Sequence, residues 1–540
     1  MVKVTCFGGA GLVTGSNYLV ETSGGLRLMI DCGLFQGGTD IERLNQEKWG
    51  YSPKEISNLV LTHAHIDHSG RIPKLVKDGF RGKIICSPPT AELCELMLLD
   101  AAHVQEMDAE WRTKKKKRQG RKGVDPLYTT ADAAASLKYF SPVELNCTID
   151  LEPGVRARLR NAGHILGSSI VELWIQDGPN ELKIVFSGDL GRRDQLIVRS
   201  PEEIFDADCL FVESTYGNRL HRSFEESKDE LLEAIRFAVS HNEKVIIPAF
   251  ALERTQEILY LLGEFSRSGK LPNIPIFLDS PLAIKATQVF RRNKAYYDAG
   301  ARAIVENGFD PFDMPNLKLT SSTVESMAIN QLSGSAIIIA ANGMCTAGRI
   351  KHHLKHNLWR YGSSIIIVGF QSEGTTGRQI VDGAKSVTIF GEKVAVRAKV
   401  FTIGGFSAHA DQADLLEWVG HFAGDPKPKV YVVHGEPFSS EVLATEIKRR
   451  LGMNASIPRR NDPLILGKAS AVPFPTTDDV VEQTLAKVLA LTDDLQDQLN
   501  VLRGGLTERH EQLPYDQLRK LRGLQEELEK LVPSHGVSAT

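Results

Sequence analysis

Four side chains of types that commonly bind metals lie within the segment LTHAHIDHSG, residues 61–70. They are His63, His65, Asp67 and His68. A polar surface loop could contain them by chance, but three imidazoles and a carboxylate this close together are far more typical of a metal site. The cluster supplies only part of such a site. The chain must therefore adopt a fold that brings further ligands to this segment.

Four later segments offer those ligands where strands are expected to end. They contain His164 in NAGHILGSS, Asp189 in FSGDLG, His409 in FSAHAD and His434 in VVHGEP. Each alone could be a core or loop residue, but together with the first cluster they indicate one metal centre. Zinc takes imidazole and carboxylate ligands, a catalytic site keeps one position open for water, and two metals need a bridging group. Neighbouring glycines let the backbone pass close to the metal with positive φ.

The size and composition of the chain predict a soluble protein of several domains. Its 540 residues exceed one ordinary domain and favour two to four. Hydrophobic residues make up 42% and charged residues 24%, which is enough for sizeable cores. Because the net charge is only −3, an overall basic field for nucleic acid is absent, although local basic patches can still exist.

Three features predict a cytoplasmic protein without a membrane segment. The opening stretch MVKVTCFGGAGLVTGSNYLV has Thr5 and paired glycines where a signal peptide would have its apolar core. No apolar run approaches the length of a membrane span. The cysteines are scattered and form no CxxC pair, which is typical of buried reduced thiols. These cysteines are Cys6, Cys32, Cys86, Cys94, Cys147, Cys209 and Cys345.

The order of apolar runs predicts one domain with a second inserted into it. Residues 1–210 alternate short strand-like runs with turns, including a hairpin turn at 23–25. Residues 211–392 alternate strands and helices, and near-continuous apolar runs such as SAIIIAANGM predict a largely parallel sheet covered on both faces. Residues 393–475 return to the first pattern. Over residues 476–540, leucines at helical spacing predict an amphipathic tail that could self-associate into a homodimer.

A basic run, RTKKKKRQGRKG at residues 112–123, follows a helical pattern at 91–110. One interpretation is a solvated loop. The alternative is a loop that contacts phosphate groups, because clustered lysine and arginine residues give sequence-independent affinity for nucleic acid. These residue types leave both interpretations open.

The first part of the chain resembles the metallo-β-lactamase fold. THAHIDHSG is similar to the HxHxDH signature of that fold, and MIDCG with Asp31, NAGHILGS with His164 and SGDLG with Asp189 are similar to its other motifs. The resemblance implies an α/β fold in which two sheets are packed between helices, an αββα sandwich.

The inserted part resembles the β-CASP domain. Its marks are VESTYG with Glu213, FSAHAD with His409 and VVHGE with His434, while PAFALERTQE and ANGMCTAGR look like bacterial and archaeal RNA-processing members. Those RNA-processing members resemble the nuclease subunit of the cleavage and polyadenylation specificity factor. Among them, this chain resembles the shorter bacterial proteins. The resemblance covers roughly residues 1–474. It implies a sandwich with an inserted α/β domain, followed by a helical C-terminal tail.

The resemblance also implies two Zn²⁺ ions per chain. The implied ligands are His63, His65 and His164 for one zinc, Asp67, His68 and His434 for the other, and Asp189 as the bridge. Asp31 is expected to orient a ligand imidazole and tune its basicity. A water between two such ions becomes hydroxide near neutral pH and can attack a phosphodiester in line.

Catalysis also needs a proton for the leaving oxygen. We name Asp67, Glu213 and His409 as catalytic residues, with His409 as the general acid and Glu213 as the carboxylate that holds and charges it. The alternative is that Glu213 and His409 form a structural pair between domains.

Two further groups of residues are candidates for substrate contacts. In QSEGTTGRQI, Thr375, Thr376 and Arg378 could hold a phosphate at a helix start, although simple helix capping would explain the same pattern. Ser407 in FSAHAD is a weaker candidate of the same kind. In HHLKH, three histidines, at 352, 353 and 356, look like a metal cluster. We expect them to form a polar helix face that could contact substrate.

The function favoured by these residues is a zinc-dependent ribonuclease that cleaves single-stranded RNA internally, in RNA processing or decay. A histidine at the third motif of the inserted domain, His434, resembles the RNA-processing rather than the DNA-repair members. A 5′–3′ exoribonuclease and a small-molecule metallo-hydrolase such as a thioesterase remain open as alternatives. A non-catalytic scaffold is disfavoured because every ligand is present.

Overall fold

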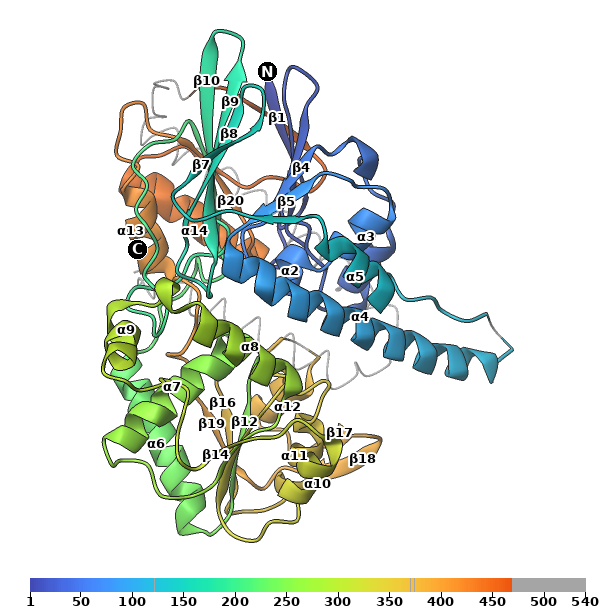
Figure 1. Cartoon of the computed structure of the whole chain (residues 1–540), viewed down its shortest axis with the longest axis vertical. Coiled ribbons are helices and arrows are strands. Elements are labelled where there is room, and N and C mark those ends of the chain that lie inside the picture. Colours follow the sequence, from blue (N-terminus) through green and yellow to red (C-terminus); the bar gives the residue numbers. More distant parts are fainter. Residues whose placement is uncertain (121, 370, 373, 469–540) are drawn as a thin grey trace, which may run out of the picture. The chain divides into compact units, whose positions relative to one another are not determined.

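The computed structural model describes residues 1–120, 122–369, 371–372 and 374–468 (Figure 1). These residues belong to one compact unit, Met1–Ser470. The tail expected over 476–540 lies outside the described residues, as does the end of the segment expected over 393–475.

Two seven-stranded sheets form the frame of the part that carries the metal-ligand segments. The first has the order β22-β1-β2-β3-β4-β5-β6 and the second the order β21-β20-β11-β10-β9-β8-β7. The strands of the first sheet are β1 (Val2–Gly8), β2 (Asn17–Glu21), β3 (Arg27–Ile30), β4 (Asn58–Val60), β5 (Lys83–Cys86), β6 (Phe140–Pro142) and β22 (Pro463–Leu466). Those of the second are β7 (Thr148–Glu152), β8 (Val155–Asn161), β9 (Ser169–Asp177), β10 (Asn180–Phe186), β11 (Cys209–Glu213), β20 (Lys429–Val433) and β21 (Ala455–Ser456). The hairpin turn expected at 23–25 joins β2 to β3 and is confirmed.

The two sheets bury a shared apolar core. In β8, Val155, Ala157 and Leu159 are buried, while the arginines between them are more exposed, so one face of the strand turns to the core. Aromatic rings extend this packing across neighbouring strands of the second sheet: Phe211 stacks on Phe186 at 4.6 Å and on Tyr431 at 4.8 Å between centroids. Aligned sheets packed in this way are stabilised mainly by burial of apolar surface.

Helices cover the outer faces of the sandwich. Around the first sheet are α1 (Thr39–Arg43), α2 (Ile66–Ser69), α3 (Ile72–Lys77), α4 (Pro88–Lys117) and α5 (Thr130–Leu137); against the second lie α13 (Gln412–Gly420) and α14 (Pro437–Glu446). Leu415 and Val419 of α13 and Leu443 of α14 are buried in one cluster with strand residues of the second sheet. The expected αββα sandwich is therefore confirmed.

The inserted part contains a six-stranded sheet of order β14-β13-β15-β12-β16-β19, in which every neighbouring pair is parallel. Its strands are β12 (Lys244–Pro248), β13 (Ile276–Leu278), β14 (Leu317–Leu319), β15 (Ala336–Ala340), β16 (Ser364–Ile367) and β19 (Lys399–Thr402), beside a hairpin of β17 (Ser386–Ile389) and β18 (Glu392–Ala395). β12 and β15 are buried along their whole length, as expected for strands covered on both faces. Because β19 pairs with β16, this sheet extends past residue 392.

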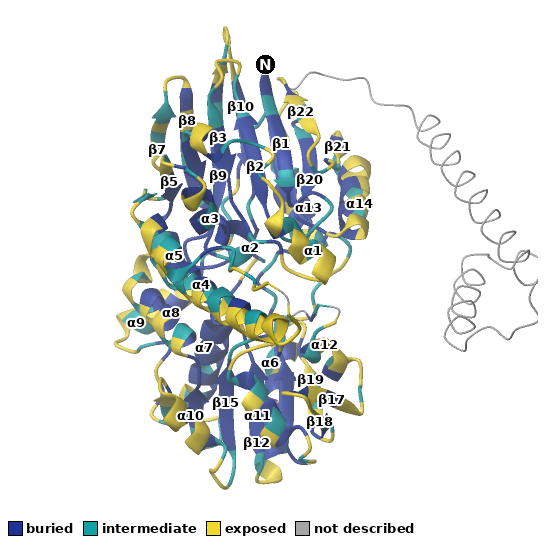
Figure 2. Ribbon diagram, turned by 90° about the vertical axis from the view of Figure 1, so that its right-hand side faces the viewer, coloured by how far each residue is buried: buried dark blue, intermediate teal, exposed yellow. Residues whose placement is uncertain are grey.

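Seven helices of the described residues surround the inserted sheet. They are α6 (Phe224–Ser240), α7 (Arg254–Arg267), α8 (Pro281–Arg292), α9 (Ala299–Glu306), α10 (Thr323–Ile329), α11 (Ile350–Asn357) and α12 (Thr376–Val381). Figure 2 shows the strands as buried and the helices with an exposed outer face. The parallel α/β unit expected from the apolar runs is confirmed.

The basic run at 112–123 differs from its expected loop conformation. α4 continues through Lys117, so the first half of the run is helical. Lysine and arginine are good helix formers, and ion pairs one turn apart, Arg112 with Asp108 and Lys114 with Glu110, favour continuation of the helix. The helix starts at the Ser87 cap, whose side chain accepts a bond from the Thr90 amide.

The expectation that all cysteines are buried is wrong at one position. Cys147 is exposed because it lies in the turn before β7, while the other six are buried and all seven are free thiols. Within the described part of the chain, none of the helices combines the length and apolar character that a membrane crossing requires.

Candidate metal centre

Most of the ligand-bearing segments follow the carboxyl ends of adjacent parallel strands, whereas His164 follows β8, which pairs antiparallel with β9. β3 and β4 run parallel with Ile30 beside Val60, so Asp31 and the histidine segment leave the first sheet together. β11 and β20 run parallel with Glu213 beside Val433, which brings Glu213 next to His434. Side chains at this edge of a parallel sheet converge, as they do in many α/β sites.

The backbone at Gly33 packs closely against the backbone of the segment that carries Asp67 and His68. The carbonyl oxygen of Asp67 lies so near Gly33 that a Cβ atom on that glycine would be 1.6 Å from it. The Cys32 amide donates to the carbonyl of His68 at 2.7 Å, which ties short helix α2 to the end of β3. Any side chain at position 33 would therefore displace the segment that carries Asp67 and His68.

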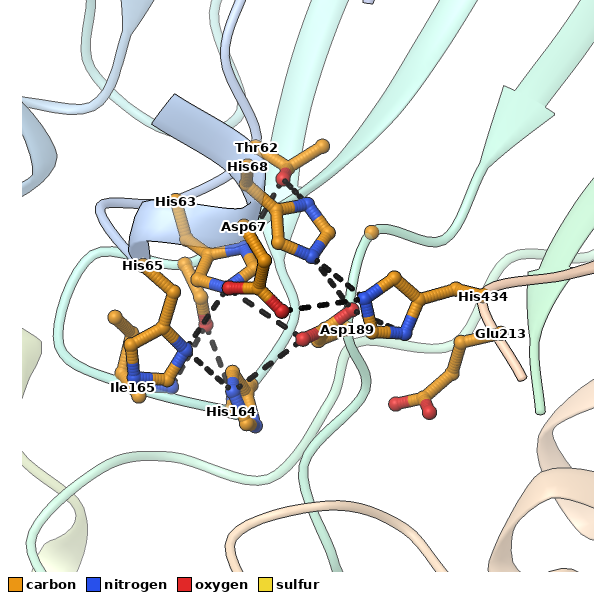
Figure 3. A network of polar contacts seen from close by, with 12 residues as sticks. Thr62, His63, His65, Asp67, His68, His164, Ile165, Asp189, Glu213 and His434 are labelled. Carbon is orange, nitrogen blue, oxygen red and sulfur yellow. Dashed lines mark hydrogen bonds and ion pairs between the residues drawn. The ribbon is translucent and has the colours of Figure 1, made fainter. Parts of the chain in front are cut away.

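A first group of ligand atoms surrounds His65 (Figure 3). The Nε2 atoms of His63 and His164 lie 3.1 and 3.2 Å from Nδ1 of His65. Oδ2 of Asp189 lies 3.5 Å from Nε2 of His63 and 3.6 Å from Nε2 of His164. All four ligand atoms lie within 4.8 Å of one another, a spacing that one cation can occupy.

A second group contains Asp67, His68 and His434. The Nε2 atoms of His68 and His434 are 3.0 Å apart, and Nε2 of His434 is 3.6 Å from Oδ2 of Asp67. Oδ1 of Asp189 lies 3.2 Å from Nε2 of His68 and 3.5 Å from Nδ1 of His434. Asp189 thus directs one carboxylate oxygen at each group.

The chemistry of this donor set fits metal ions. Oδ1 of Asp189 is buried and accepts no hydrogen bond of regular geometry among the described residues, although ring nitrogens of His68 and His434 lie 3.2 and 3.5 Å away, so a cation between them would satisfy it. Imidazole nitrogens that face one another at 3.0–3.2 Å also repel through their lone pairs unless a proton or a metal lies between them. Two such groups joined by one carboxylate match the requirement for a bridged pair of ions.

The protonation of the first group favours metal binding. Burial lowers the pKa of His63 and His164 well below the usual histidine range and that of His65 to about 4. Burial alone would raise the pKa of Asp189, but the nearby His434 and other histidines hold it well below its usual value. Neutral imidazoles around an ionised carboxylate are the forms that ligate metals.

Asp31 holds the ring of His68. Its Oδ2 lies 2.7 Å from Nδ1 of His68, which leaves Nε2 turned toward Asp189. Burial would lower the pKa of His68, but Asp189 and Asp31 raise it well above the usual range. A metal that binds Nε2 must therefore displace a proton, while Asp31 keeps the ring orientation.

Two threonines at the centre were missed by the sequence analysis. Thr62 donates its amide to Asp31 at 2.8 Å and its hydroxyl at 2.9 Å, and the same hydroxyl lies 3.0 Å from Nδ1 of His63. Thr215 places its hydroxyl 3.2 Å from Nδ1 of His434. Both stand directly beside motif residues, in LTHAH and VESTYG, and only that adjacency could have identified them.

Glu213 and His409 form a pair beside the two groups. Oε1 of Glu213 lies 3.2 Å from Nδ1 of His409 and also accepts the amide of Leu190 at 2.7 Å. Burial lowers the pKa of His409, but the charge and hydrogen bond of Glu213 outweigh it and raise the pKa to about 9. The His409 ring packs against that of His164 at 4.4 Å between centroids, so a cationic imidazole borders the centre.

Of the four candidate phosphate-binding residues, three form hydrogen bonds or ion pairs within the protein, and the fourth, Thr376, is the first residue of α12. Thr375 caps α12: its hydroxyl accepts the Arg378 amide at 3.2 Å and donates to the Ser372 carbonyl at 2.7 Å. Arg378 forms an ion pair with Asp382 at 2.9 Å, and Thr376 begins α12. The hydroxyl of Ser407 accepts the amide of His409 at 3.3 Å. Capping thus accounts for Thr375, and phosphate contact by these residues stays a prediction.

The expectation of a polar face at HHLKH is wrong for its middle histidine. His353 is fully buried, with Nε2 2.7 Å from Asp279 and Nδ1 3.0 Å from Asn330. Asp279 also accepts from Arg349 at 2.7 Å, which completes a buried polar network. His352 and His356 are exposed, so the three rings do not form one cluster.

The inserted part reaches the His164 loop through Glu253. This residue adopts φ +65° before α7, is buried, and accepts the Leu166 amide at 3.2 Å. Gln195 donates from its side chain to the His164 carbonyl at 3.0 Å and to Glu257 at 3.3 Å. Burial and the neighbouring Glu257 raise the pKa of Glu253 well above its usual range. The loop that positions His164 is therefore held by residues of the inserted part.

Three family models match separate stretches of the chain. The metallo-beta-lactamase superfamily model matches residues 10–249, the Beta-Casp domain model residues 255–380, and the Zn-dependent metallo-hydrolase RNA specificity domain model residues 393–458.

Individual proteins are similar over most of the chain. Ribonuclease TTHA0252 from Thermus thermophilus is 36% identical over 435 residues, which cover 81% of this chain and 93% of that protein. The transcription termination factor FttA from Pyrococcus abyssi is 31% identical over 482 residues, 86% of this chain and 71% of that protein. The FttA protein of Thermococcus kodakarensis is 33% identical over 418 residues, 76% of this chain and 62% of that protein.

Proposed function

The chain belongs to the metallo-beta-lactamase superfamily, in the group that carries a Beta-Casp domain, and from this premise we propose that it is a metal-dependent ribonuclease. Its proposed reaction is hydrolysis of phosphodiester bonds in single-stranded RNA. The observation that carries the proposal is that Asp189 turns one carboxylate oxygen toward each of two histidine groups. The ribonuclease from Thermus thermophilus, matched over 93% of its length, supports RNA as the substrate class.

The proposed cofactor is a pair of Zn²⁺ ions. The residues that would hold them are His63, His65 and His164 in one group, Asp67, His68 and His434 in the other, and Asp189 in both. Bound ions of this kind supply an activated water for attack on phosphorus and offset the negative charge that grows on the phosphoryl oxygens. The chain contributes the orientation: Asp31 fixes His68, and Thr62 fixes Asp31.

The proposed general acid is His409. The Glu213 carboxylate favours its imidazolium form, which can donate a proton from Nε2 to the leaving oxygen. Glu213 is fully buried and receives the Leu190 and Thr215 amides, so it can hold the ring without leaving its own position. The His409 ring packs against the ring of the ligand His164, and this position beside the metal centre favours a catalytic role for Glu213 and His409 over a purely structural one.

The proposal also covers the division of the chain into domains and the compartment in which the protein acts. We propose a metallo-β-lactamase part at 1–210 and 393–475, a β-CASP part at 211–392 to whose sheet β19 (Lys399–Thr402) is added, and an appended tail at 476–540, through which the chain would dimerise. The six buried free cysteines support a reducing, cytoplasmic setting.

A cleavage assay tests the proposed function. Purified zinc-loaded protein is incubated with 5′-labelled single-stranded RNA and with DNA of the same sequence, and the products are separated on a sequencing gel. Internal RNA fragments with intact DNA are expected, and these would identify an endoribonuclease. Mononucleotides alone would identify an exoribonuclease of the same family. No cleavage of either strand by fully loaded protein would favour a small-molecule hydrolase.

A further inference from the structure

The outer half of α4 and the turn after it, residues 104–120, form a projecting basic arm. In Figure 1 this half of α4 extends beyond the helices and strands around it, and in Figure 2 it is mostly exposed. A contact in its outer half ties the arm to the returning chain: the Thr113 hydroxyl donates to the Val124 carbonyl at 3.1 Å and accepts the Val124 amide at 2.9 Å. The arm is therefore held in place, while many of its side chains are exposed and can contact a partner.

One face of the basic arm carries large apolar side chains that are exposed to solvent. Val104, Met107 and Trp111 follow one another at helical spacing and are 52%, 55% and 61% exposed. The ammonium group of Lys115, one turn beyond Trp111, lies 5.4 Å from the indole centroid. An aromatic ring this exposed on a protruding helix has no role in packing the core.

The charge of the basic arm is concentrated and largely uncompensated. Arg112 and Lys114 pair with acidic residues one turn earlier, but Lys115, Lys116, Lys117 and Arg118 have no carboxylate within 4.0 Å among the described residues. The carboxyl end of a helix favours positive charge by a few tenths of a kcal/mol to about 1 kcal/mol. That explains one or two lysines in the last turn rather than a run of five basic residues in a chain whose net charge is −3.

The inner end of α4 lies against the metal centre. The hydroxyls of Ser87 and Thr90 both donate to the carbonyl of Gly167, at 2.5 and 2.9 Å, and Gly167 belongs to the loop that carries His164. Lys115 is 25 residues beyond Thr90, a helix length of about 37 Å at about 1.5 Å per residue. At about 3.4 Å per stacked nucleotide, this length corresponds to roughly eleven nucleotides.

We propose that the basic arm binds the RNA strand upstream or downstream of the bond being cleaved, about ten nucleotides from the metal centre. The lysines contact phosphates without reading sequence, and Trp111 stacks on a base. This inference rests on the proposed ribonuclease function. RNA is favoured over other partners because a flexible polyanion with exposed bases complements both the lysine cluster and a single exposed indole. An anionic membrane and a second copy of this chain are the competing partners.

The test compares RNA binding by full-length protein in which His409→Ala suppresses cleavage while both groups of metal ligands stay in place. Single-stranded RNAs of 30 and 6 nucleotides are titrated at several salt concentrations against three arm variants: the triple variant K115Q/K116Q/K117Q, W111A and W111F. The matched control is K48Q/K270Q/K393Q, which removes three exposed lysines outside the arm. Gel filtration and binding to phosphatidylserine vesicles are measured in parallel.

The arm variants should lose affinity for long RNA but not for short RNA. For the 30-mer, the triple variant should lower the slope of log affinity against log salt by about 2, at about 0.7 per phosphate contact. W111A should weaken binding about tenfold, whereas W111F should retain most of it. Affinity for the 6-mer, which is too short to reach the arm, should not change, and the control variant should behave as the parent.

Two results would overturn the proposal: unchanged 30-mer affinity and salt slope in the triple variant, or an equal loss for both RNAs. Retained RNA binding with lost vesicle binding or lost oligomerisation would also overturn it, in favour of the corresponding partner. The failure of the proposed function is distinguishable, because cleavage is measured separately with the wild-type catalytic centre. Tight, arm-dependent binding of RNA that wild-type protein leaves uncut would refute the ribonuclease and retain the arm.

Discussion

Glu213 and His409 are separated by 196 residues of chain, yet Oε1 of Glu213 lies 3.2 Å from Nδ1 of His409. The carboxylate is fully buried and is held by two backbone amides, whereas the His409 side chain is 22% exposed. A buried carboxylate fixed in this way keeps the neighbouring imidazole protonated and oriented. The pair therefore has the properties of a proton donor directed at the centre.

The first prediction concerns loss of that donor. His409→Ala should lower kcat by about 10²- to 10⁴-fold, the range typical of a general acid. Zinc content and RNA affinity should stay near the wild-type values, because the imidazole is not in either ligand group. Single-turnover cleavage and metal analysis by mass spectrometry measure both effects. If zinc is lost together with activity, His409 is a ligand or a structural residue.

The second prediction concerns pH. A general acid works only while protonated, so activity should be lost as the pH rises through the pKa of His409, which Glu213 raises to about 9 against the effect of burial. Glu213→Gln removes the charge that raises this pKa. The alkaline limb of the kcat profile should then move to lower pH, while the acidic limb stays in place. An alkaline limb at the same pH in both proteins would show that another group sets it.

The third prediction concerns metal stoichiometry. Wild-type protein should bind two zinc ions per chain. His164→Ala and His434→Ala should each retain about one, because each removes a ligand from a different group. Asp189→Asn should lose both ions and all activity, since its two oxygens serve both groups. Asp40→Asn, a side chain that is 92% exposed, is the charge-matched control. One ion per chain in saturated wild-type protein would contradict the bridged centre.

The fourth prediction concerns the residues behind the ligands. Asp31→Asn and Thr62→Val should each weaken zinc binding by about 10- to 100-fold, the usual effect of removing a partner that orients a ligand imidazole. Both remove a contact to the His68 ring or to the carboxylate that holds it. Competition with a fluorescent chelator measures the affinity. Unchanged affinity in Thr62→Val would mean that Asp31 holds its position without the threonine.

The ligands could be predicted from the sequence because their chemistry is local. Imidazoles and carboxylates beside glycines at strand ends are recognisable in short motifs, and parallel strands bring such ends together. The α/β character of the inserted part followed from apolar runs in the same way. Thr62 was missed because a threonine before a histidine has many ordinary roles, and its bond to Asp31 spans 31 residues.

The expectations from sequence were wrong where contacts with residues far away in the chain, or local helix propensity, determined the burial or secondary structure of a residue. His353 is buried because Asp279, 74 residues earlier, receives its ring, and nothing in HHLKH indicates that partner. The basic run at 112–123 was expected to be a loop because of its charge, although lysine and arginine propagate helices well. Cys147 is exposed because a turn ends just before β7, and element boundaries of this kind are poorly defined by sequence.

The last prediction concerns Glu253, which joins the inserted part to the His164 loop. Burial and Glu257 raise the pKa of Glu253 well above its usual value, so the folded protein retains a proton that the unfolded chain releases above about pH 4.3. The contribution of Glu253 to stability should therefore fall as the pH rises from that point toward the folded-state pKa. Glu253→Gln keeps the acceptor for the Leu166 amide and removes this titration.

In urea unfolding of the metal-free protein, the free energy of unfolding of the wild type minus that of Glu253→Gln should fall between about pH 4.5 and 7, by up to about 1.4 kcal/mol per pH unit for one proton. Glu253→Ala removes the acceptor as well and should cost about 1–3 kcal/mol at every pH, because the Leu166 amide is left buried without its partner. The two variants separate the charge from the hydrogen bond. Parallel pH profiles in wild type and Glu253→Gln would show that Glu253 is ionised in the folded protein, with Glu257 carrying the proton instead.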